Sequence, residues 1–162
     1  MEIQTTFYKS PIGIAKITGT KNGIESISVL GEEDKSIIFS DEIPHCLQTC
    51  VTQLDEYFNG KRSGFDLLVN PQGTNFQKKV WKSLTKVGFG KTKSYLQQAK
   101  TLGDVKAIRA VATANGKNPI WIVIPCHRII GSDGSLTGYA GGIWRKKWLL
   151  DHENPVKQQS LF

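Results

Sequence analysis

The sequence predicts an α+β protein in which a small N-terminal α/β domain precedes a mainly helical domain. Two segments rich in isoleucine and valine near the N-terminus indicate strands, and short segments with capping signals after Thr74 indicate helices. The charge balance also changes sign, because residues 1–72 carry 6 Lys and Arg against 10 Asp and Glu, whereas residues 73–162 carry 15 against 4. We therefore expect one domain over residues 1–72, a second over residues 73–155, and a tail over residues 156–162.

The N-terminal elements follow from their spacing. Segments 12–18 and 24–30 have strand composition, and Asn22-Gly23 between them favours a tight turn, so a two-stranded meander is expected. Residues 44–58 then predict a helix that ends at Asn59-Gly60. Its apolar side chains at helical spacing are Leu47, Val51, Leu54 and Phe58.

Three capping signals organise the C-terminal half. Thr74 and Ser94 are each followed three residues later by glutamine, the spacing of a capping box, and Asp104 can cap a further helix that runs to Gly116. The two short helices joined by a Gly-Asp turn resemble a helix-turn-helix unit, and an ordinary helical hairpin has the same spacing. Beyond them, the stretch IWIVIP (residues 120–125) has the composition of a buried strand.

The helix that ends at Gly116 carries a stripe of small side chains. Ala107, Ala110 and Ala114 fall at i, i+3 and i+7, with Arg109 beside them. Such a stripe lets a helix come close either to a narrow nucleic-acid groove or to a neighbouring helix. Both interpretations stay open on spacing alone.

Charge and composition restrict the partners. The positive second half favours a polyanion, with nucleic acid ahead of an anionic membrane surface, although a solvated surface has the same composition. No apolar run approaches the roughly 20 residues of a membrane span, and the first residues, MEIQTTFYK, contain no apolar signal region. Three cysteines are too few for a disulfide framework. We expect a soluble, cytoplasmic protein with reduced thiols and no membrane partner.

The heptapeptide IPCHRII places Cys126 beside His127 at the end of an apolar run. A thiolate is a nucleophile, and a histidine or a cation such as Arg128 can lower the thiol pKa from about 8.5. Adjacent residues of an extended strand point to opposite faces, so a contact between thiol and imidazole requires a turn or a bridging water. The short stretch around Cys126 also fits a buried structural cysteine, and it fits the Cys-His dyad of a cysteine hydrolase.

The longer run NPIWIVIPCHRIIGSDGSLTGYAGGIWRKKWLLDHE (residues 118–153) resembles the active-site segment of the O6-alkylguanine-DNA alkyltransferase family. FQKKVWKSLTKVGFGKTKSY and KAIRAVATANGKNP extend the resemblance over residues 74–153, and SPIGIAKIT and LDEYFNGKR match more loosely. The alanine of TGYAGG, Ala140, is similar to the bacterial constitutive type. The resemblance implies a ribonuclease H-like N-terminal domain and a winged-helix-like DNA-binding domain that carries the active-site cysteine.

The resemblance also implies catalytic roles at the matching positions. Cys126 is the alkyl acceptor, His127 the base that acts through a water, and Glu153 the carboxylate that orients the histidine. Asn118 fixes the turn that brings them together. Tyr95 hydrogen-bonds the extruded base and helps the guanine to leave.

The resemblance further implies a second group of residues that contact DNA. Arg109 fills the vacated place in the base stack, and the bare alanine stripe lets its helix approach the minor groove. Tyr139 lies in the loop over the base pocket. The expected DNA-binding residues are Arg109, Ala107, Ala110, Ala114, Arg128 and Tyr139.

The implied reaction is repair of duplex DNA that contains O6-alkylguanine, with O4-alkylthymine as a second candidate substrate. The alkyl group passes irreversibly to Cys126, and each molecule acts once because water does not hydrolyse a thioether. No cofactor and no metal are expected, and the protein is expected to act as a monomer. A lesion-binding module without transfer is an alternative. Gln98 departs from the family pattern, which commonly has leucine there.

Two features lie outside this resemblance. Cys46 and Cys50 stand at i, i+4 beside His45, but two ligands on one helix rarely complete a tetrahedral metal site, so we interpret them as half-buried thiols. The final residues, QQSLF, run from Gln158 to Phe162 and resemble the peptide by which bacterial DNA-processing proteins dock on the sliding clamp. We therefore expect the bacterial sliding clamp as a second partner.

Overall fold

The computed structural model describes residues 2–31, 37 and 39–155, which form two compact units. The first unit contains residues 1–72 together with Pro119–Trp121, and the second contains residues 73–118 and 122–162. The C-terminal QQSLF lies outside the described residues. Among those described, no helix is long and apolar enough to cross a membrane.

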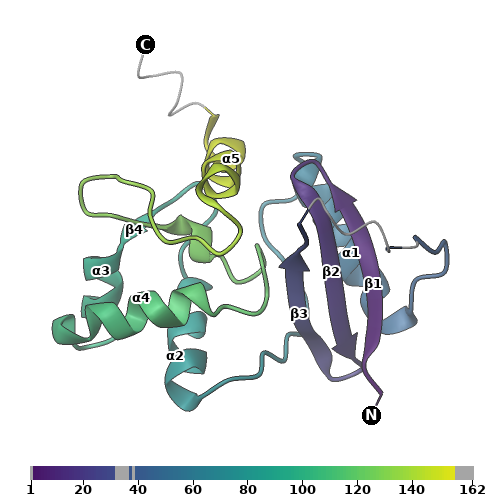
Figure 1. Ribbon diagram of the computed structural model, residues 1–162, viewed down its shortest axis with the longest axis horizontal. Helices are drawn as coiled ribbons and strands as arrows, with labels where there is room; N and C mark the ends of the chain where they lie inside the picture. Colours follow the sequence, from purple (N-terminus) through teal and green to yellow (C-terminus); the bar gives the residue numbers. More distant parts are fainter. Residues whose placement is uncertain (1, 32–36, 38, 156–162) are drawn as a thin grey trace. The chain divides into compact units, whose positions relative to one another are not determined.

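The first unit is an antiparallel sheet with a helix against one face (Figure 1). Its strands β1 (Gln4–Ser10), β2 (Gly13–Thr20) and β3 (Gly23–Val29) lie in sequence order, and α1 spans His45–Phe58. Apolar side chains from both layers form its core, namely Ile17, Ile27, Leu47, Leu54 and Tyr57.

The predicted meander is confirmed as β2 and β3, but the sheet has a third strand that the sequence analysis missed. The β1 sequence, QTTFYKS, has no run of isoleucine or valine, and its buried side chains include the polar Thr6 and Ser10. β1 forms a strand because it pairs with β2 along its whole length, although its residues have little preference for strand structure by themselves. The hairpin turn consists of Lys21 and Asn22, because Thr20 already pairs with Gly23.

The second unit consists of short helices and one two-stranded sheet (Figure 1). Both predicted capping boxes are present, at Thr74 and Ser94, and the Asp104 side chain accepts a hydrogen bond from the Lys106 backbone. The elements in chain order are α2 (Asn75–Leu84), β4 (Lys93–Ser94), α3 (Tyr95–Thr101), η1 (Val105–Ala107), α4 (Ile108–Gly116), η2 (Cys126–Arg128), β5 (Ile129–Ile130) and α5 (Ile143–Glu153).

Gln98 is accommodated by a polar partner in place of the apolar contacts of a leucine. Gln98 is 3% exposed, and its Nε2 donates to Asn115 Oδ1 at 2.9 Å, while Asn115 Nδ2 donates back to Gln98 Oε1 at 2.7 Å. Reciprocal hydrogen bonds satisfy both buried amides and tie α3 to α4.

The strand predicted for IWIVIP is wrong. Burial is confirmed, since Ile120, Ile122 and Ile124 are each at most 2% exposed, but residues 121–123 form a turn. Only Ile120 makes a strand-like bridge, to Ile27 of β3. Ile122 has φ +70°, a left-handed conformation that is costly for a β-branched residue. Composition predicted burial here, and burial does not specify backbone conformation.

Candidate active site

A small parallel sheet fixes the ends of the two segments that carry the predicted catalytic residues. Lys93 pairs with Ile129 and Ser94 with Ile130. Tyr95 follows β4 directly, and η2, which contains Cys126, immediately precedes β5. These segments are far apart in sequence, and the sheet joins them.

The chain turns sharply at Cys126. Pro125 has φ −85° and ψ 66°, and the Cys126 N–H donates to Ile124 O at 2.9 Å, which is the geometry of an inverse γ-turn. Asn118 Nδ2 donates to the same carbonyl at 2.7 Å, and the Asn118 side chain also hydrogen-bonds the Cys126 thiol. The 3-10 turn η2 follows, so Cys126 and His127 do not lie on an extended strand.

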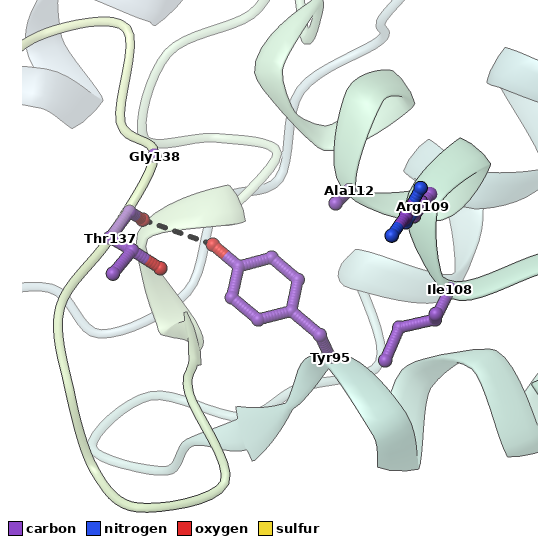
Figure 2. A pocket seen from close by; sticks show the side chains of 6 residues that line it. All are labelled: Tyr95, Ile108, Arg109, Ala112, Thr137 and Gly138. Atoms are coloured by element: carbon purple, nitrogen blue, oxygen red, sulfur yellow. Dashed lines mark hydrogen bonds between the residues drawn. The ribbon is translucent and has the colours of Figure 1, made fainter.

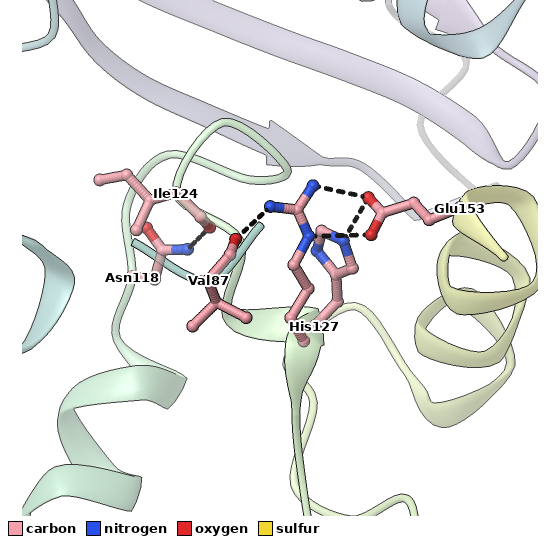
Figure 3. A network of polar contacts seen from close by, with 6 residues as sticks. Val87, Asn118, Ile124, His127 and Glu153 are labelled. Carbon is pink, nitrogen blue, oxygen red and sulfur yellow. Dashed lines mark hydrogen bonds and ion pairs between the residues drawn. The ribbon is translucent and has the colours of Figure 1, made fainter. Parts of the chain in front are cut away.

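Behind this turn, His127 and Arg128 share one buried carboxylate (Figure 3). His127 Nε2 lies 2.8 Å from Glu153 Oε2. Arg128 Nε donates to Oε1 at 2.8 Å and Nη2 donates to Oε2 at 3.0 Å, while Nη1 donates to Val87 O at 2.7 Å. A carboxylate only accepts hydrogen bonds, so the imidazole proton is on Nε2 and Nδ1 is left as the acceptor.

Electrostatics favour a neutral imidazole and a charged carboxylate. Burial holds the pKa of His127 below its ordinary value, and the hydrogen bond to Glu153 opposes that shift only in part. Burial alone would raise the pKa of Glu153, but hydrogen bonds and charges from His127 and Arg128 outweigh it and hold the pKa well below the usual range. His127 Nδ1 is buried and has no hydrogen-bond partner among the described residues.

The groups around Cys126 shift the pKa of its thiol in opposite directions. Although the residue keeps some accessible surface, burial raises the pKa of its thiol, and the Asn118 hydrogen bond and the charge of Lys146 act in the opposite direction. Lys146 therefore joins the site, although the sequence analysis did not identify it. Lys146, Leu149 and Glu153 are the buried residues of α5, at i, i+3 and i+7, and this helical spacing was the available signal.

A pocket of about 380 Å³ lies between α4, Tyr95 and the loop before α5 (Figure 2). It is lined by Tyr95, Ile108, Arg109, Ala112, Thr137 and Gly138. Its size is within the range of small-molecule sites. Tyr95 Oη donates to Thr137 O at 3.0 Å, and Lys146 Nζ donates to the same carbonyl at 3.0 Å. Tyr95 and Arg109 therefore line the same pocket. Cys126 and Tyr139 are not among the residues that line it.

Two predicted DNA contacts require correction. Arg128 is 6% exposed and its three guanidinium nitrogens donate to protein acceptors, so it is not available to DNA. Ala114 is 3% exposed because Trp81 packs over the end of α4, where Trp81 Nε1 donates to Ala114 O at 2.8 Å. The exposed part of the stripe is limited to Ala110, beside Arg109, and the half-buried Ala107.

The cysteines of α1 form no metal site in the part of the chain described. No group of three or more His, Cys, Asp or Glu there could hold an ion. Cys50 is buried, which raises its thiol pKa to about 12, and Cys46 is half-buried.

Both units match domains of one known protein family. Residues 3–71 match the model for the ribonuclease-like domain of 6-O-methylguanine DNA methyltransferase, and residues 75–155 match its DNA binding domain. These matches confirm the predicted fold class.

Similar proteins cover nearly the whole chain. A Methylated-DNA--protein-cysteine methyltransferase of Methanosarcina barkeri is 44% identical over 90% of this chain and 93% of its own length. The enzyme of that name from Mycobacterium bovis is 41% identical over 89% of this chain and 88% of its own length. A crystal structure of Mycobacterium tuberculosis OGT in complex with DNA is 40% identical, covers 93% of this chain and 92% of that chain, and has a TM-score of 0.83. The chain belongs to the 6-O-methylguanine DNA methyltransferase family.

Proposed function

We propose that this protein is a methylated-DNA–protein-cysteine methyltransferase, which repairs DNA by transferring an alkyl group from O6 of guanine to its own Cys126. The names of its relatives and the DNA complex of the M. tuberculosis protein support DNA binding and alkyl transfer. The observation that carries the assignment to Cys126 is its position on a tight turn, with Asn118 on the thiol and the pair of His127 and Glu153 behind it.

Access to the lesion requires base flipping. The O6 position of guanine lies inside the duplex stack, so the nucleotide must be extruded at a cost of a few kcal/mol. Arg109 is exposed and borders the pocket, which suits it to occupy the vacated stack. Tyr95 lines the same pocket and can offer its hydroxyl proton to the base when it releases Thr137.

The transfer follows from the protonation states at the site. His127 Nδ1, the free acceptor, takes the thiol proton of Cys126 through a bridging water, and Glu153 stabilises the resulting imidazolium. The thiolate attacks the saturated alkyl carbon, the carbon–oxygen bond breaks, and its electron pair moves to O6 of guanine. The departing guanine takes a proton from the Tyr95 hydroxyl, and the proton that His127 received from Cys126 returns Tyr95 to its neutral phenol through water. The thioether product is stable to water, so each molecule acts once.

The experiment is a stoichiometric titration. The protein is mixed with increasing amounts of duplex containing O6-methylguanine, and methyl groups transferred per protein are counted by intact mass. We expect a plateau at one methyl group, none for Cys126→Ala, and an unchanged plateau for the matched Cys46→Ala variant. Binding of the duplex without any adduct would instead support a lesion-binding module, and continuing turnover would support a hydrolase.

We also propose that the protein transfers alkyl groups from O4-alkylthymine to Cys126. The pocket proposed to receive the extruded base is lined by Tyr95, Ile108, Arg109, Ala112, Thr137 and Gly138. The same titration with O4-methylthymine duplex is expected to give slower transfer to Cys126, and a complete lack of transfer would restrict the substrate to guanine.

We further propose that the protein acts as a monomer in the cytoplasm and docks on the bacterial sliding clamp through QQSLF at its C-terminus. A terminal Leu-Phe pair on a short peptide suits insertion into an apolar pocket. Deletion of residues 158–162 should abolish clamp binding in a titration while leaving methyl transfer intact. Equal clamp affinity with and without these residues would contradict this part of the proposal.

A further inference from the structure

The loop of residues 87–90, which follows α2, contacts the buried pair of Arg128 and Glu153, although the proposed reaction gives it no role. Arg128 Nη1 donates to the carbonyl of Val87 at 2.7 Å (Figure 3). The guanidinium carbon of Arg128 lies 5.9 Å from the centre of the Phe89 ring. The cation of the buried pair is therefore attached to the first part of this loop.

The last residue of the loop is attached to the end of α5. Asn154, which caps α5 at its C-terminus, donates from Nδ2 to Gly90 O at 3.1 Å, and its own N–H donates to Leu150 O at 3.0 Å. Gly90 has φ +75°, and a Cβ at this position would lie 3.1 Å from Glu153 O. A side chain at residue 90 would therefore press on the backbone of the residue that carries the buried carboxylate.

These contacts connect the two groups to which the proposed reaction assigns proton transfers. The loop contacts the backbone of Glu153, whose carboxylate lies 2.8 Å from His127 Nε2. Further along the chain it leads into β4, and Tyr95 follows β4 directly. The loop thus joins the carboxylate that orients the base to the segment that carries the phenol.

We propose that Asn154 is a positioning residue for the proposed base. Its hydrogen bond to Gly90 fixes the C-terminal end of α5, and this end carries Glu153, which orients His127. Glu153 is the last residue of α5, and helix ends fray, so a contact outside the helix is needed to hold its carboxylate in place. The inference rests on the proposed function, because it assumes that His127 takes the thiol proton of Cys126.

The first test removes the Asn154 hydrogen bond by substitution. Asn154→Leu has a similar volume, adds no charge and cannot donate to Gly90. Asn154→Gln keeps an amide donor and should restore most of the wild-type behaviour. The matched control is Asn59→Leu, because Asn59 caps the C-terminus of α1 and donates from its side chain to Asp55 O at 2.8 Å.

The first readout is single-turnover methyl transfer from O6-methylguanine duplex over a range of DNA concentrations. Asn154→Leu should lower the maximal rate by at least about tenfold, because a displaced base loses part of the roughly 10²–10⁴-fold that positioned proton transfer contributes. The DNA concentration at half-maximal rate should not change, because Asn154 does not line the pocket. Asn59→Leu should have the wild-type rate.

A double variant shows whether Asn154 acts through the imidazole. In a His127→Gln background, Asn154→Leu should cause no further loss of rate, because the group that it positions is already absent. An equal further loss in that background would overturn the proposal.

A second pair of variants tests the contact from the side of the loop. Gly90→Ala places a methyl group against Glu153 O and should lower the maximal rate as Asn154→Leu does. Its matched control is Gly60→Ala, because Gly60 has φ +73° and open space at its Cβ position, so the substitution causes the same backbone strain without the contact. If the two alanine variants transfer methyl groups at the same rate, the proposal is wrong.

A spectroscopic measurement needs neither DNA nor methyl transfer. The 1H resonance of the His127 Nε2 proton, identified by its loss in His127→Gln, reports the hydrogen bond to Glu153. It should shift upfield in Asn154→Leu and in Gly90→Ala, and it should keep its wild-type position in the two control variants. An unchanged resonance in Asn154→Leu and Gly90→Ala would overturn the inference. A protein that shows these shifts but transfers no methyl group would instead refute the proposed function alone.

Discussion

Arg128 donates hydrogen bonds to both carboxylate oxygens of Glu153, from Nε to Oε1 at 2.8 Å and from Nη2 to Oε2 at 3.0 Å. This bidentate pair is buried, and the same carboxylate accepts a hydrogen bond from His127 Nε2 at 2.8 Å. Arg128 therefore fixes the group that orients the predicted base, and it does so from inside the domain.

Removal of Arg128 should destabilise the protein strongly. In Arg128→Met, Glu153 remains buried with one of its two partners lost, and breaking a buried pair in this way costs about 3–5 kcal/mol. The measurement is urea unfolding at neutral pH. The control is Arg62→Met, because Arg62 and Glu56 form a partly exposed pair, and such pairs contribute about 0–1 kcal/mol. Equal losses in the two variants would contradict a structural role for the buried pair.

Stability should fall on acidification, beginning near pH 6.5. Folding holds the pKa of His127 below 6.5, mainly through burial, so below this pH the unfolded chain binds a proton that the folded protein does not. The carboxyl of Glu153, whose folded pKa is depressed, adds a loss of the same sign below pH 4.5. Each such proton contributes a slope of up to about 1.4 kcal/mol per pH unit.

This pH dependence is measured as the free energy of unfolding between pH 8 and pH 4. His127→Gln should flatten the curve between pH 6.5 and 5, whereas His45→Gln, at an exposed position on α1, should leave the curve unchanged. A wild-type protein that gains stability on acidification would show that His127 is protonated in the folded state.

Arg109→Ala should slow repair of duplex DNA by at least about tenfold, because the vacated base stack loses its filler. The discriminating measurement is single-turnover transfer from two substrates, the alkylated duplex and the free O6-alkylguanine base. The free base needs no extrusion, so its rate should be unchanged. Lys106→Ala serves as the control for a nearby exposed cation. An equal decrease on both substrates would assign Arg109 to the chemistry and not to flipping.

Replacing Gln98 by leucine should destabilise the protein by about 1–3 kcal/mol, because Asn115 is then buried without its partner. Replacing both residues by leucine removes the orphaned amide, so the double variant should lose less stability than the two single variants summed. Chemical unfolding of the four proteins gives this coupling directly. Additive losses would mean that the two amides do not depend on each other.

Local signals predicted α1, α2, α3 and α4, whereas α5 (Ile143–Glu153) was not predicted. The capping boxes at Thr74 and Ser94 involve residues three apart, so the sequence contains the whole interaction. The strand β1 was missed because its stability comes from pairing with β2, which no local pattern in QTTFYKS indicates. IWIVIP was assigned the wrong conformation, since its burial arises from packing of a turn.

The sequence identified most residues of the site, but it did not identify the residues that they contact. The resemblance named Cys126, His127 and Glu153, and the structure places the last two 2.8 Å apart. Arg128 was wrongly assigned to DNA and Lys146 was not identified, because a basic residue looks exposed until the fold shows what surrounds it. Both are buried, and both contact residues that are distant in the sequence.

The central claim is that Cys126, and no other thiol, receives the methyl group. The most direct measurement uses duplex DNA with an isotopically labelled O6-methyl group, followed by proteolysis and tandem mass spectrometry of the three cysteine peptides. We predict the label quantitatively on the peptide containing Cys126, as a thioether, with none on Cys46 or Cys50. Label on another residue, or its release as methanol with the protein unmodified, would contradict the account.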